Sequence, residues 1–435
     1  MTNYNEKIKK VLDGIIANMS ENKEKYVIDP KKNFIRNRKL PFETMVKLIL
    51  SMKGNTLNKE LYDFFGKNPE EIVSSSAFVQ QRTKISEQFF IDLFHNFNNS
   101  MTDMKTFKGY KIYAVDGSDI NIAFDADAPT YIRPQHTKKG ELTKGFNQYH
   151  LNAIYDVLNR VYVDAKLQPR PQLNERRMFL DMLQDMNLPI KTIFIADRGY
   201  PSWNFFANFK HKKNAEYVVR VRDSENLLVK HLPMIELDID RKTIATCNTK
   251  KGKLSGYSYF TKKKIESGDW DFGEEEELNF RIVRFKISDT TYETIMTSLP
   301  RDKFSIEDIK KLYAMRWGIE TSFRQLKYVI GLTNFHAKKD SFIVQEIFAK
   351  LTMYNFCERI ISAAVVKQDN NRKYSYQVNY TMGMQICLDF FRSLVKTDNV
   401  YSLILKYIEA IKPGRSDVRK LKPKTFVCFT YRVAA

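Results

Sequence analysis

The spacing of hydrophobic residues separates a helical region at the start of the chain from a mixed region after it. Over residues 1–105 the apolar residues recur at helical spacing, as in FETMVKLILSM and SEQFFIDLFHNF. Pro30, Gly54 and the GKNPEE turn interrupt this pattern. We therefore predict several short helices over residues 1–105.

The pattern changes at Tyr110, where strand-like segments begin. Three strands with short connections are predicted in YKIYAVDGSDINIAF, QYHLNAIYDVL and RVYVDAKLQP. The segments NERRMFLDMLQDM, IKTIFIAD, SWNFFANFKHKK and AEYVVRVR then alternate between helix and strand. Three strands followed by helix, strand, helix and strand is the order expected of an α/β fold, with a mixed sheet and helices packed on it.

Two further changes of pattern divide the rest of the chain. From about residue 223 to 298 the sequence is β-rich and irregular, which indicates an insertion. The segment SIEDIKKLYAMRWGIETSFRQLK then predicts one long helix, and residues 339–435 are helical before a basic tail, KPGRSDVRKLKPK. Because a chain of 435 residues is too long for one ordinary domain, we predict three, over residues 1–105, 106–338 and 339–435.

Composition points to a polyanionic partner. The chain has 71 Lys and Arg against 51 Asp and Glu, a net charge of +20, and five of nine residues in KKNFIRNRK are basic. A field of this sign attracts nucleic acid, so residues 1–105 are predicted to be a basic DNA-binding domain, although such a run also suits a solvated face. No run of eighteen apolar residues is present, and the first residues lack a signal-peptide core, so we expect a soluble intracellular protein. The four cysteines show no metal-binding spacing.

Candidate chemistry begins with carboxylates at the ends of apolar runs. Asp116 ends YKIYAVD and Asp197 ends IKTIFIAD. The carboxyl ends of strands line the ligand crevice in sheets of this class, although an aspartate there can also simply cap a turn. Together with Glu320 they would form a group of hard oxygen ligands suited to Mg²⁺ or Mn²⁺. In a basic protein, such ions indicate phosphoryl transfer on a nucleic acid.

The helix YAMRWGIETSFRQLK carries a second pattern. At 100° per residue, Tyr313, Arg316, Glu320 and Lys327 share one narrow stripe beside the apolar seam. Ordinary surface ion pairs of Glu320 with Arg316 or Arg324, four residues apart, would explain part of this stripe, but they would not explain Tyr313 or Lys327. Side chains of these types along roughly 20 Å of helix suit a phosphate backbone, with Glu320 as a third metal ligand.

These residues resemble motifs of a known family. Tyr313, Arg316, Glu320 and Lys327 have the spacing of the YREK signature of IS4-type insertion-sequence DDE transposases, which are similar in plan to the transposases of Tn5 and Tn10. The segments VDGSD and DRGYPS resemble the motifs around the two aspartates of that family, and the longer gap before Glu320 holds the β-rich insertion. Agreement of all three motifs is more specific than any one of them.

The resemblance implies an RNase H-like catalytic domain in which Asp116, Asp197 and Glu320 hold two Mg²⁺ ions, with Mn²⁺ as a substitute. It implies cut-and-paste transposition in the bacterial cytoplasm, on the nucleoid: the inverted-repeat ends of an element are cleaved by hydrolysis, and their 3′-hydroxyls are joined to target DNA. Double-stranded DNA is the implied partner, and a homodimer would bring the two ends together. Among the basic residues, Arg198 would assist in contacting phosphates near the cleaved end.

Further DNA contacts are predicted outside the three motifs. The segment YIRPQHTKKGELTKG is expected to be a loop near DNA, or alternatively a plain solvated loop; its basic residues are Arg133, Lys138, Lys139 and Lys144. Some relatives hold a flipped base against an aromatic residue of the insertion. Tyr292 and Trp270 are candidates, but both are expected to pack in the protein interior, and Trp317 is expected to pack at a domain edge.

Three other functions compete with transposition. A co-opted transposase could bind DNA without cutting it, as a repressor or architectural protein, although all three acids are intact. An RNase H-like nuclease or resolvase would use the same residues. A glycosidase with paired carboxylates is disfavoured by the positive charge and by the phosphate-binding stripe.

Overall fold

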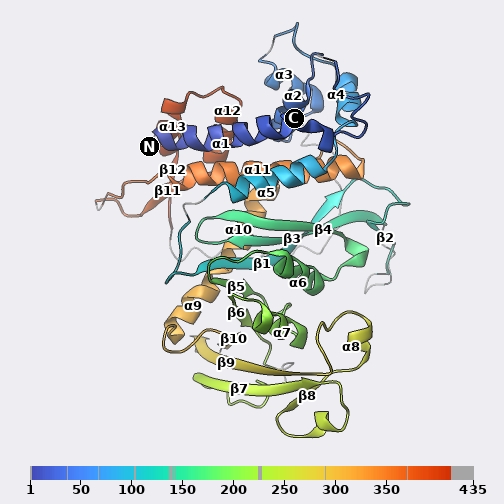
Figure 1. The fold of residues 1–435 in the computed structure, drawn as a ribbon. Helices are drawn as coiled ribbons and strands as arrows, with labels where there is room; N and C mark the ends of the chain where they lie inside the picture. The colour runs from blue at the N-terminus through green and yellow to red at the C-terminus, as the bar shows by residue number, and fades with distance from the viewer. Residues whose placement is uncertain are drawn as a thin grey trace.

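In the computed structural model, one long sheet runs through most of the molecule (Figure 1). The structure describes residues 2–36, 38–66, 68–101, 104–136, 140, 142, 144–223, 228–289, 291–369 and 371–412. The sheet begins with three antiparallel strands, β1 (Lys111–Ile122), β3 (Phe146–Asp156) and β4 (Val161–Pro169). Strands β5 (Thr192–Ala196) and β6 (Ala215–Arg220) then run parallel to β1. The mixed sheet predicted for this α/β chain is therefore confirmed.

The β-rich segment after β6 continues the same sheet. Strand β10 (Thr291–Thr297) pairs with β6, and β9 (Glu275–Ser288), β7 (Leu237–Thr246) and β8 (Tyr257–Tyr259) follow in that spatial order. The sequence between about residues 223 and 298 thus forms strands, as expected, and these strands lengthen the sheet at the lower end of Figure 1. At the other end, the two-residue strand β2 (Tyr131–Ile132) pairs with β3.

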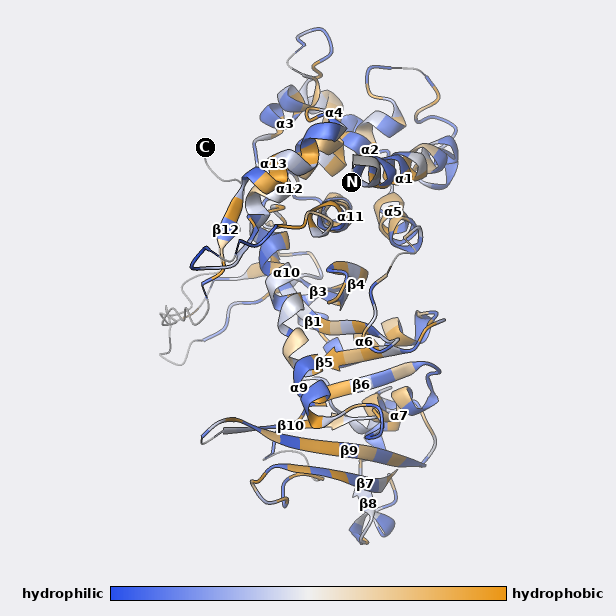
Figure 2. Ribbon diagram, turned by 90° about the vertical axis from the view of Figure 1, so that its left-hand side faces the viewer, coloured by the Kyte–Doolittle hydropathy of each residue, from blue (hydrophilic) through white to orange (hydrophobic). Residues whose placement is uncertain are grey.

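Helices cover both faces of the strands near β5. Figure 2 shows α9 (Ile306–Met315) and α10 (Trp317–Tyr328) on one side of these strands, and α6 (Glu175–Asp185) and α7 (Trp203–His211) on the other. Side chains alternate along a strand, so Val115 packs in the core beside α6 and α7 while Ile112 packs beside α9. By the same alternation, Asp116 and Asp197 belong to the face of the sheet covered by α9 and α10.

The segment predicted as one helix over residues 305–327 is divided at Arg316. Ser305 begins α9 with a capping box to Asp308, as its sequence favours. The Arg316 N–H donates to the Tyr313 carbonyl at 3.1 Å, and the Ile319 N–H donates to the Arg316 carbonyl at 3.2 Å, both three residues back along the chain. This tighter turn separates α9 from α10, so the prediction of one uniform helix is wrong at this point. It coincides with the residue whose side chain turns into the protein.

Helices from both ends of the chain form a layer beside β3 and β4 (Figure 1). The central helix, α11 (Asp340–Ser362), packs against helices of the first hundred residues and against α12 (Tyr380–Phe391). One hydrophobic cluster joins them. The expected division into three domains stays a prediction. The helices of the first and the last of these expected domains share one hydrophobic core. The helices of the first hundred residues are α1 (Thr2–Glu21), α2 (Phe42–Ser51), α3 (Leu57–Phe64), α4 (Ser75–Arg82) and α5 (Gln88–Asn99).

Short elements complete the structure. They are the helix α8 (Lys263–Glu266), the helix α13 (Val400–Lys406), the two-stranded sheet of β11 (Tyr376–Val378) and β12 (Ile408–Ala410), and the 3₁₀ turns at Lys23–Lys25, Arg170–Gln172, Lys251–Lys253 and Thr397–Asn399. Within the described ranges, no helix has both the length and the apolar character needed to span a lipid bilayer. Most of the basic C-terminal tail lies outside the described residues.

The buried glutamate Glu358 on α11 makes the stability of this layer depend on pH. Its carboxylate accepts hydrogen bonds from Tyr354 at 3.2 Å and Tyr380 at 3.1 Å, and Arg160 lies 3.6 Å away. Burial raises its pKa to about 7. Because this value exceeds the value of about 4.3 expected in the unfolded chain, folding favours the protonated form. The contribution to stability is fully present below about pH 4 and is lost as the pH rises through about 7.

We therefore expect the free energy of unfolding to differ between wild type and Glu358→Gln in a pH-dependent way. Glutamine resembles the protonated acid, so the wild type should lose roughly 3 kcal/mol relative to the variant between about pH 4 and pH 8. Urea unfolding at several pH values measures this difference. Glu409→Gln, at an exposed position, is the control and should give a flat difference. A flat difference for Glu358→Gln as well would contradict the prediction.

Candidate catalytic site

Asp116 and Asp197 lie on neighbouring parallel strands. The register of β1 and β5 pairs Val115 with Ala196, so the two aspartates follow at the next position, where strands are about 4.8 Å apart. Asp197 directly follows β5, as predicted. Asp116 does not end its strand, because β1 continues to Ile122 in pairing with β3. The partner strand β5 stops at Ala196, however, so Asp116 still lies beside an open place in the sheet.

Arg316 links these aspartates to Glu320. The Arg316 Nη1 atom lies 2.7 Å from Glu320 Oε1, and the negative charge of Asp197 also raises the pKa of the guanidinium. The positive charge of Arg316 in turn lowers the pKa of Asp116. Tyr313 donates a hydrogen bond of 3.4 Å to Asp197. The structure therefore gathers the three predicted acids, Tyr313 and Arg316 at one site.

The burial of Arg316 adds to this picture. The residue is 5% exposed, and its Nε has no hydrogen-bond partner among the described residues. A buried guanidinium with a spare donor can grip an oxyanion, and it neutralises part of the carboxylate charge until one arrives.

Asp116 is the most perturbed of the three acids. Its pKa is raised to about 6, chiefly by burial, and a hydrogen bond of 2.9 Å from the Gly117 N–H opposes this effect. The negative charges of Glu175 and Glu320 raise the pKa further. A carboxyl with this pKa exchanges its proton near neutral pH, which is typical of functional sites.

Glu175 and His150, to which sequence analysis assigned no functional role, lie near this site together with Tyr200 of the DRGYPS motif. The Tyr200 hydroxyl donates to Glu175 at 2.8 Å. Burial raises the pKa of Tyr200 well above its usual value, and the negative charges of Glu175, Asp116 and Asp197 raise it further. His150 pairs with Glu175 at 3.7 Å. The local sequence NERR shows only a helix N-terminus with an acidic first turn, which is an ordinary feature, so the pattern carried no signal for this role.

The other predicted contacts are placed as follows. Lys327 is half-buried, and its Nζ donates to the Asp119 carbonyl at 2.7 Å, so it leans toward β1. Arg198, Arg133 and Lys144 are exposed. Lys138 and Lys139 lie outside the described residues.

The aromatic residues differ in how far they match expectation. Trp270 is buried and packs on Phe260 with ring centroids 4.4 Å apart, which confirms a packing role. Tyr292 is half-buried. The expectation that Trp317 packs at a domain edge is wrong, because it is 60% exposed. The tight turn at Arg316 directs the arginine inward and leaves the indole outside, with the guanidinium 4.8 Å from its ring.

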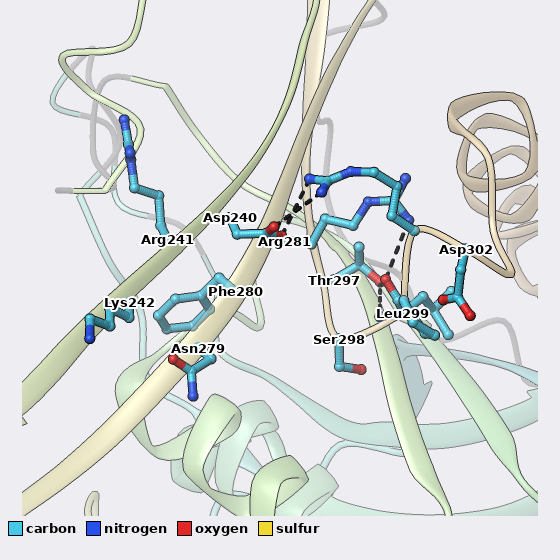
Figure 3. A pocket seen from close by; sticks show the side chains of 12 residues that line it. Asp240, Arg241, Lys242, Asn279, Phe280, Arg281, Thr297, Ser298, Leu299 and Asp302 are labelled. Carbon is cyan, nitrogen blue, oxygen red and sulfur yellow. Dashed lines mark hydrogen bonds and ion pairs between the residues drawn. The ribbon is translucent and has the colours of Figure 1, made fainter.

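Cavity size does not identify this site. The cavity of about 690 Å³ shown in Figure 3 lies between β7, β9 and the segment after β10, and none of the three acids lines it. Its buried arginine, Arg281, pairs with Asp238 at 2.9 Å and donates to the Phe304 carbonyl at 2.8 Å. Arg301 pairs with Asp240 at 3.1 Å. These ion pairs support the packing of the extended sheet.

The chemistry of the donor set suits a divalent ion, but the side chains are not arranged as a ready metal cage. Among the described residues, no group of three or more His, Cys, Asp or Glu side chains is positioned to hold a metal ion. The Arg316–Glu320 pair gives a physical reason, since the guanidinium already neutralises a carboxylate there. The three acids are nevertheless hard oxygen donors at one place, with an orphaned donor beside them, as a site for a cation and a phosphate requires.

Comparisons with known proteins agree with these motifs. The model of the family described as "Transposase DDE domain" matches residues 107–356. The putative transposase InsL for insertion sequence element IS186A, from Escherichia coli strain K12, is 34% identical over 71 residues, which are 16% of this chain and 19% of the relative. The transposase for insertion sequence element IS421, from Escherichia coli, matches with the same figures. The chain thus spans about a fifth of the length of these curated relatives.

A solved structure also resembles this chain. It is a cryo-EM structure of the piggyBac transposase synaptic complex with hairpin DNA. The TM-score is 0.48 at 9% sequence identity, and the match covers 97% of this chain and 86% of the other.

Proposed function

Because the chain belongs to the DDE transposase family, whose model matches more than half of it, we propose that it moves an insertion sequence by cutting and joining DNA. It binds the inverted-repeat ends of the element, cleaves them by hydrolysis and joins the 3′-hydroxyl ends to target DNA. The observation that supports this proposal best is the placement of Asp116 and Asp197 at neighbouring positions on one face of the sheet, with the ion pair of Arg316 and Glu320 on the helices that cover that face. The IS4 type, action in the bacterial cytoplasm and a homodimer on two DNA ends belong to the same proposal.

Asp116, Asp197 and Glu320 are proposed to hold the metal ions. The family generally uses divalent metal ions. Bound Mg²⁺ or Mn²⁺ would activate the attacking water or hydroxyl and stabilise the leaving oxygen. Two ions are proposed because an in-line displacement at phosphorus has both an attacking and a leaving oxygen.

The neighbouring residues orient the DNA strand. Arg316 could offer two parallel N–H donors to a phosphate, and it would be free for this task if Glu320 held a cation instead of the guanidinium. The Tyr313 hydroxyl, now donating to Asp197, can turn to a phosphate oxygen. Lys327 supplies a point charge farther along α10, and Arg198, Arg133, Lys138, Lys139 and Lys144 are proposed contacts with the rest of the duplex.

A cleavage assay tests the proposal against its competitors. The substrate is a DNA duplex that carries the inverted repeats flanking the gene, incubated with the full chain and Mg²⁺. A transposase cuts at the repeat end, leaves a 3′-hydroxyl and joins it to a supercoiled plasmid. A silent DNA-binding protein retards the duplex in a gel but never cuts it. A nuclease or resolvase cuts without joining ends to the plasmid, and either result would overturn the proposal.

Lys327→Ala is expected to weaken binding of the repeat DNA and to lower the slope of log affinity against log salt by about 1. The physical reason is the loss of one phosphate contact and the counterion released with it. Fluorescence anisotropy at several salt concentrations measures the slope. The control is Lys166→Ala, which removes a lysine of β4 that pairs with Asp185 of α6, and it should leave the slope unchanged. An unchanged slope for Lys327→Ala would remove this residue from the DNA contacts.

A further inference from the structure

The end of the sheet farthest from the helical layer is strongly basic (Figure 1). The 24 residues from 241 to 264 include eight Lys and Arg and no Asp or Glu, in a chain whose net charge is +20. All eight are exposed, and they lie on β7, on α8 and in the turns on either side of β8. We call these eight residues the basic lobe; they are Arg241, Lys242, Lys250, Lys251, Lys253, Lys262, Lys263 and Lys264.

Most charges of the basic lobe are not neutralised within the protein. Lys251 pairs with Glu275 at 2.9 Å, and Lys262 lies 3.7 Å from Glu274. The other six members pair with no carboxylate among the residues that the structure describes. Figure 3 shows two of them, Arg241 and Lys242, with side chains that point away from Asp240. Like charges gathered at one end of a molecule repel one another, and a bound polyanion would relieve this repulsion.

Packing of the lobe does not depend on these basic side chains. Trp270 packs on Phe260, and its indole N–H donates to the Gly273 carbonyl at 2.7 Å. The turn after β7 lies directly on β8, because Gly252 has no Cβ, which would be 2.7 Å from the Cβ of Tyr259. The lysines are therefore carried by a framework of apolar contacts and strand pairing, and this framework gives no reason for their number.

The basic lobe lies within reach of DNA that is cut at the acids. Five strand-to-strand steps separate β5, which precedes Asp197, from β8. At about 4.8 Å a step this is roughly 24 Å, the length of about 7 base pairs. Helix α10 extends from the level of β5 toward the helical layer, away from the lobe (Figure 2). DNA that follows α10 from Arg316 to Lys327 on one side of the cut would meet the lobe on the other side.

We propose that the basic lobe binds the phosphate backbone of the DNA that flanks the element, beyond the cut from the inverted repeat. Lysine contacts with phosphates carry no sequence information. They therefore suit flanking DNA, whose sequence changes with each insertion site, better than they suit a repeat of fixed sequence. This inference rests on the proposed cleavage of DNA ends and adds a second DNA-binding surface to it.

A series of duplexes tests the inference on the wild-type chain. Each duplex carries the same inverted repeat, and the flank is either absent, shorter than about 7 base pairs or longer than that. Fluorescence anisotropy without divalent ions, so that no flank is cut, gives the slope of log affinity against log salt. Only the longer flanks should steepen the slope, by about 0.9 for each phosphate that the lobe neutralises. Equal slopes for all flank lengths would overturn the inference.

A charge-neutral variant assigns the additional slope to the basic lobe. Lys250→Gln, Lys253→Gln and Lys263→Gln, combined in one chain, remove three exposed charges that are not ion-paired to a described residue. The variant should lose roughly 2–3 units of the slope measured with a long flank and keep the wild-type slope without a flank. An unchanged melting temperature would show that the fold is intact. A wild-type slope on the long flank would exclude the lobe as the flank-binding surface.

The matched control removes three exposed lysines at the other end of the molecule. It combines Lys367→Gln, Lys396→Gln and Lys406→Gln and should keep the wild-type difference between flanked and unflanked duplexes. Weaker joining of ends to a plasmid by the lobe variant, with its flank dependence intact, would assign the lobe to target DNA and overturn the inference alone. If the wild-type chain failed to bind even the unflanked repeat, the proposed function would be overturned as well.

Discussion

Asp197→Asn is expected to lower the rate of end cleavage by at least about 10³-fold while the chain still binds the repeat DNA. Asparagine has nearly the same shape and its oxygen still accepts from Tyr313, so the fold should be kept. It lacks the negative charge that a divalent ion requires. Cleavage of labelled repeat DNA and anisotropy on the same preparation measure the two properties separately.

The other two acids should behave in the same way for related reasons. Asp116→Asn imitates the protonated form of a carboxyl whose pKa is about 6, and Glu320→Gln keeps an oxygen for Arg316 at 2.7 Å. Asp185→Asn, at an exposed position that pairs with Lys166, is the matched control and should cut like the wild type. If all three site variants lost DNA binding together with cleavage, the loss would indicate a damaged surface and would contradict a metal role.

Local periodicity placed Asp197 correctly relative to its strand, whereas the roles of the three acids stay predictions. Asp197 follows β5 as its apolar run predicted, and the stripe of Tyr313, Arg316 and Glu320 does meet the aspartates. The strand predicted in YKIYAVDGSDINIAF agrees with β1, but the apolar run YKIYAVD placed Asp116 at the end of a strand, and β1 continues beyond it. Pairing with β3 carries the strand on to Ile122, and that pairing partner is about thirty residues away in the sequence.

The break at Arg316 could not be predicted from the same pattern. Uniform winding places residues at fixed angles, and no proline or glycine precedes the break to signal it. The shorter turn moves Arg316 into the protein and Trp317 into solvent. Uniform winding had placed Trp317 at the domain edge. An error of one turn thus changes which side chains face the acids.

Glu175 and His150 were missed because their contacts are not local. His150 meets Asp119 across paired strands, and Glu175 meets Tyr200 between a helix and a loop. Single-sequence periodicity reports which face of an element is buried but not which faces come together. The same limit applies to the helical layer, where elements from the two ends of the chain share one core.

That shared core contains a buried ionic joint between α4 and α11. Arg82, the last residue of α4, is 1% exposed, and all three of its hydrogen bonds reach α11. Its Nε donates to Gln345 at 2.8 Å, its Nη1 to Glu346 at 2.8 Å, and its Nη2 to the Phe342 carbonyl at 2.7 Å. His336, 3.2 Å away, is the other ionic partner of Glu346 in the described structure.

Arg82→Met is therefore expected to lower the free energy of unfolding by about 3–5 kcal/mol, because it leaves the charge of Glu346 buried without its main partner. Urea unfolding with an unchanged m value would assign the loss to the native state. Arg372→Met removes an exposed arginine that lies 3.8 Å from Asp369 and should cost less than about 0.5 kcal/mol. Adding Glu346→Leu to Arg82→Met should restore part of the loss, since both charges are then gone. A cost below about 1 kcal/mol for Arg82→Met would show that the apolar contacts of the shared core hold α4 on α11 without this joint.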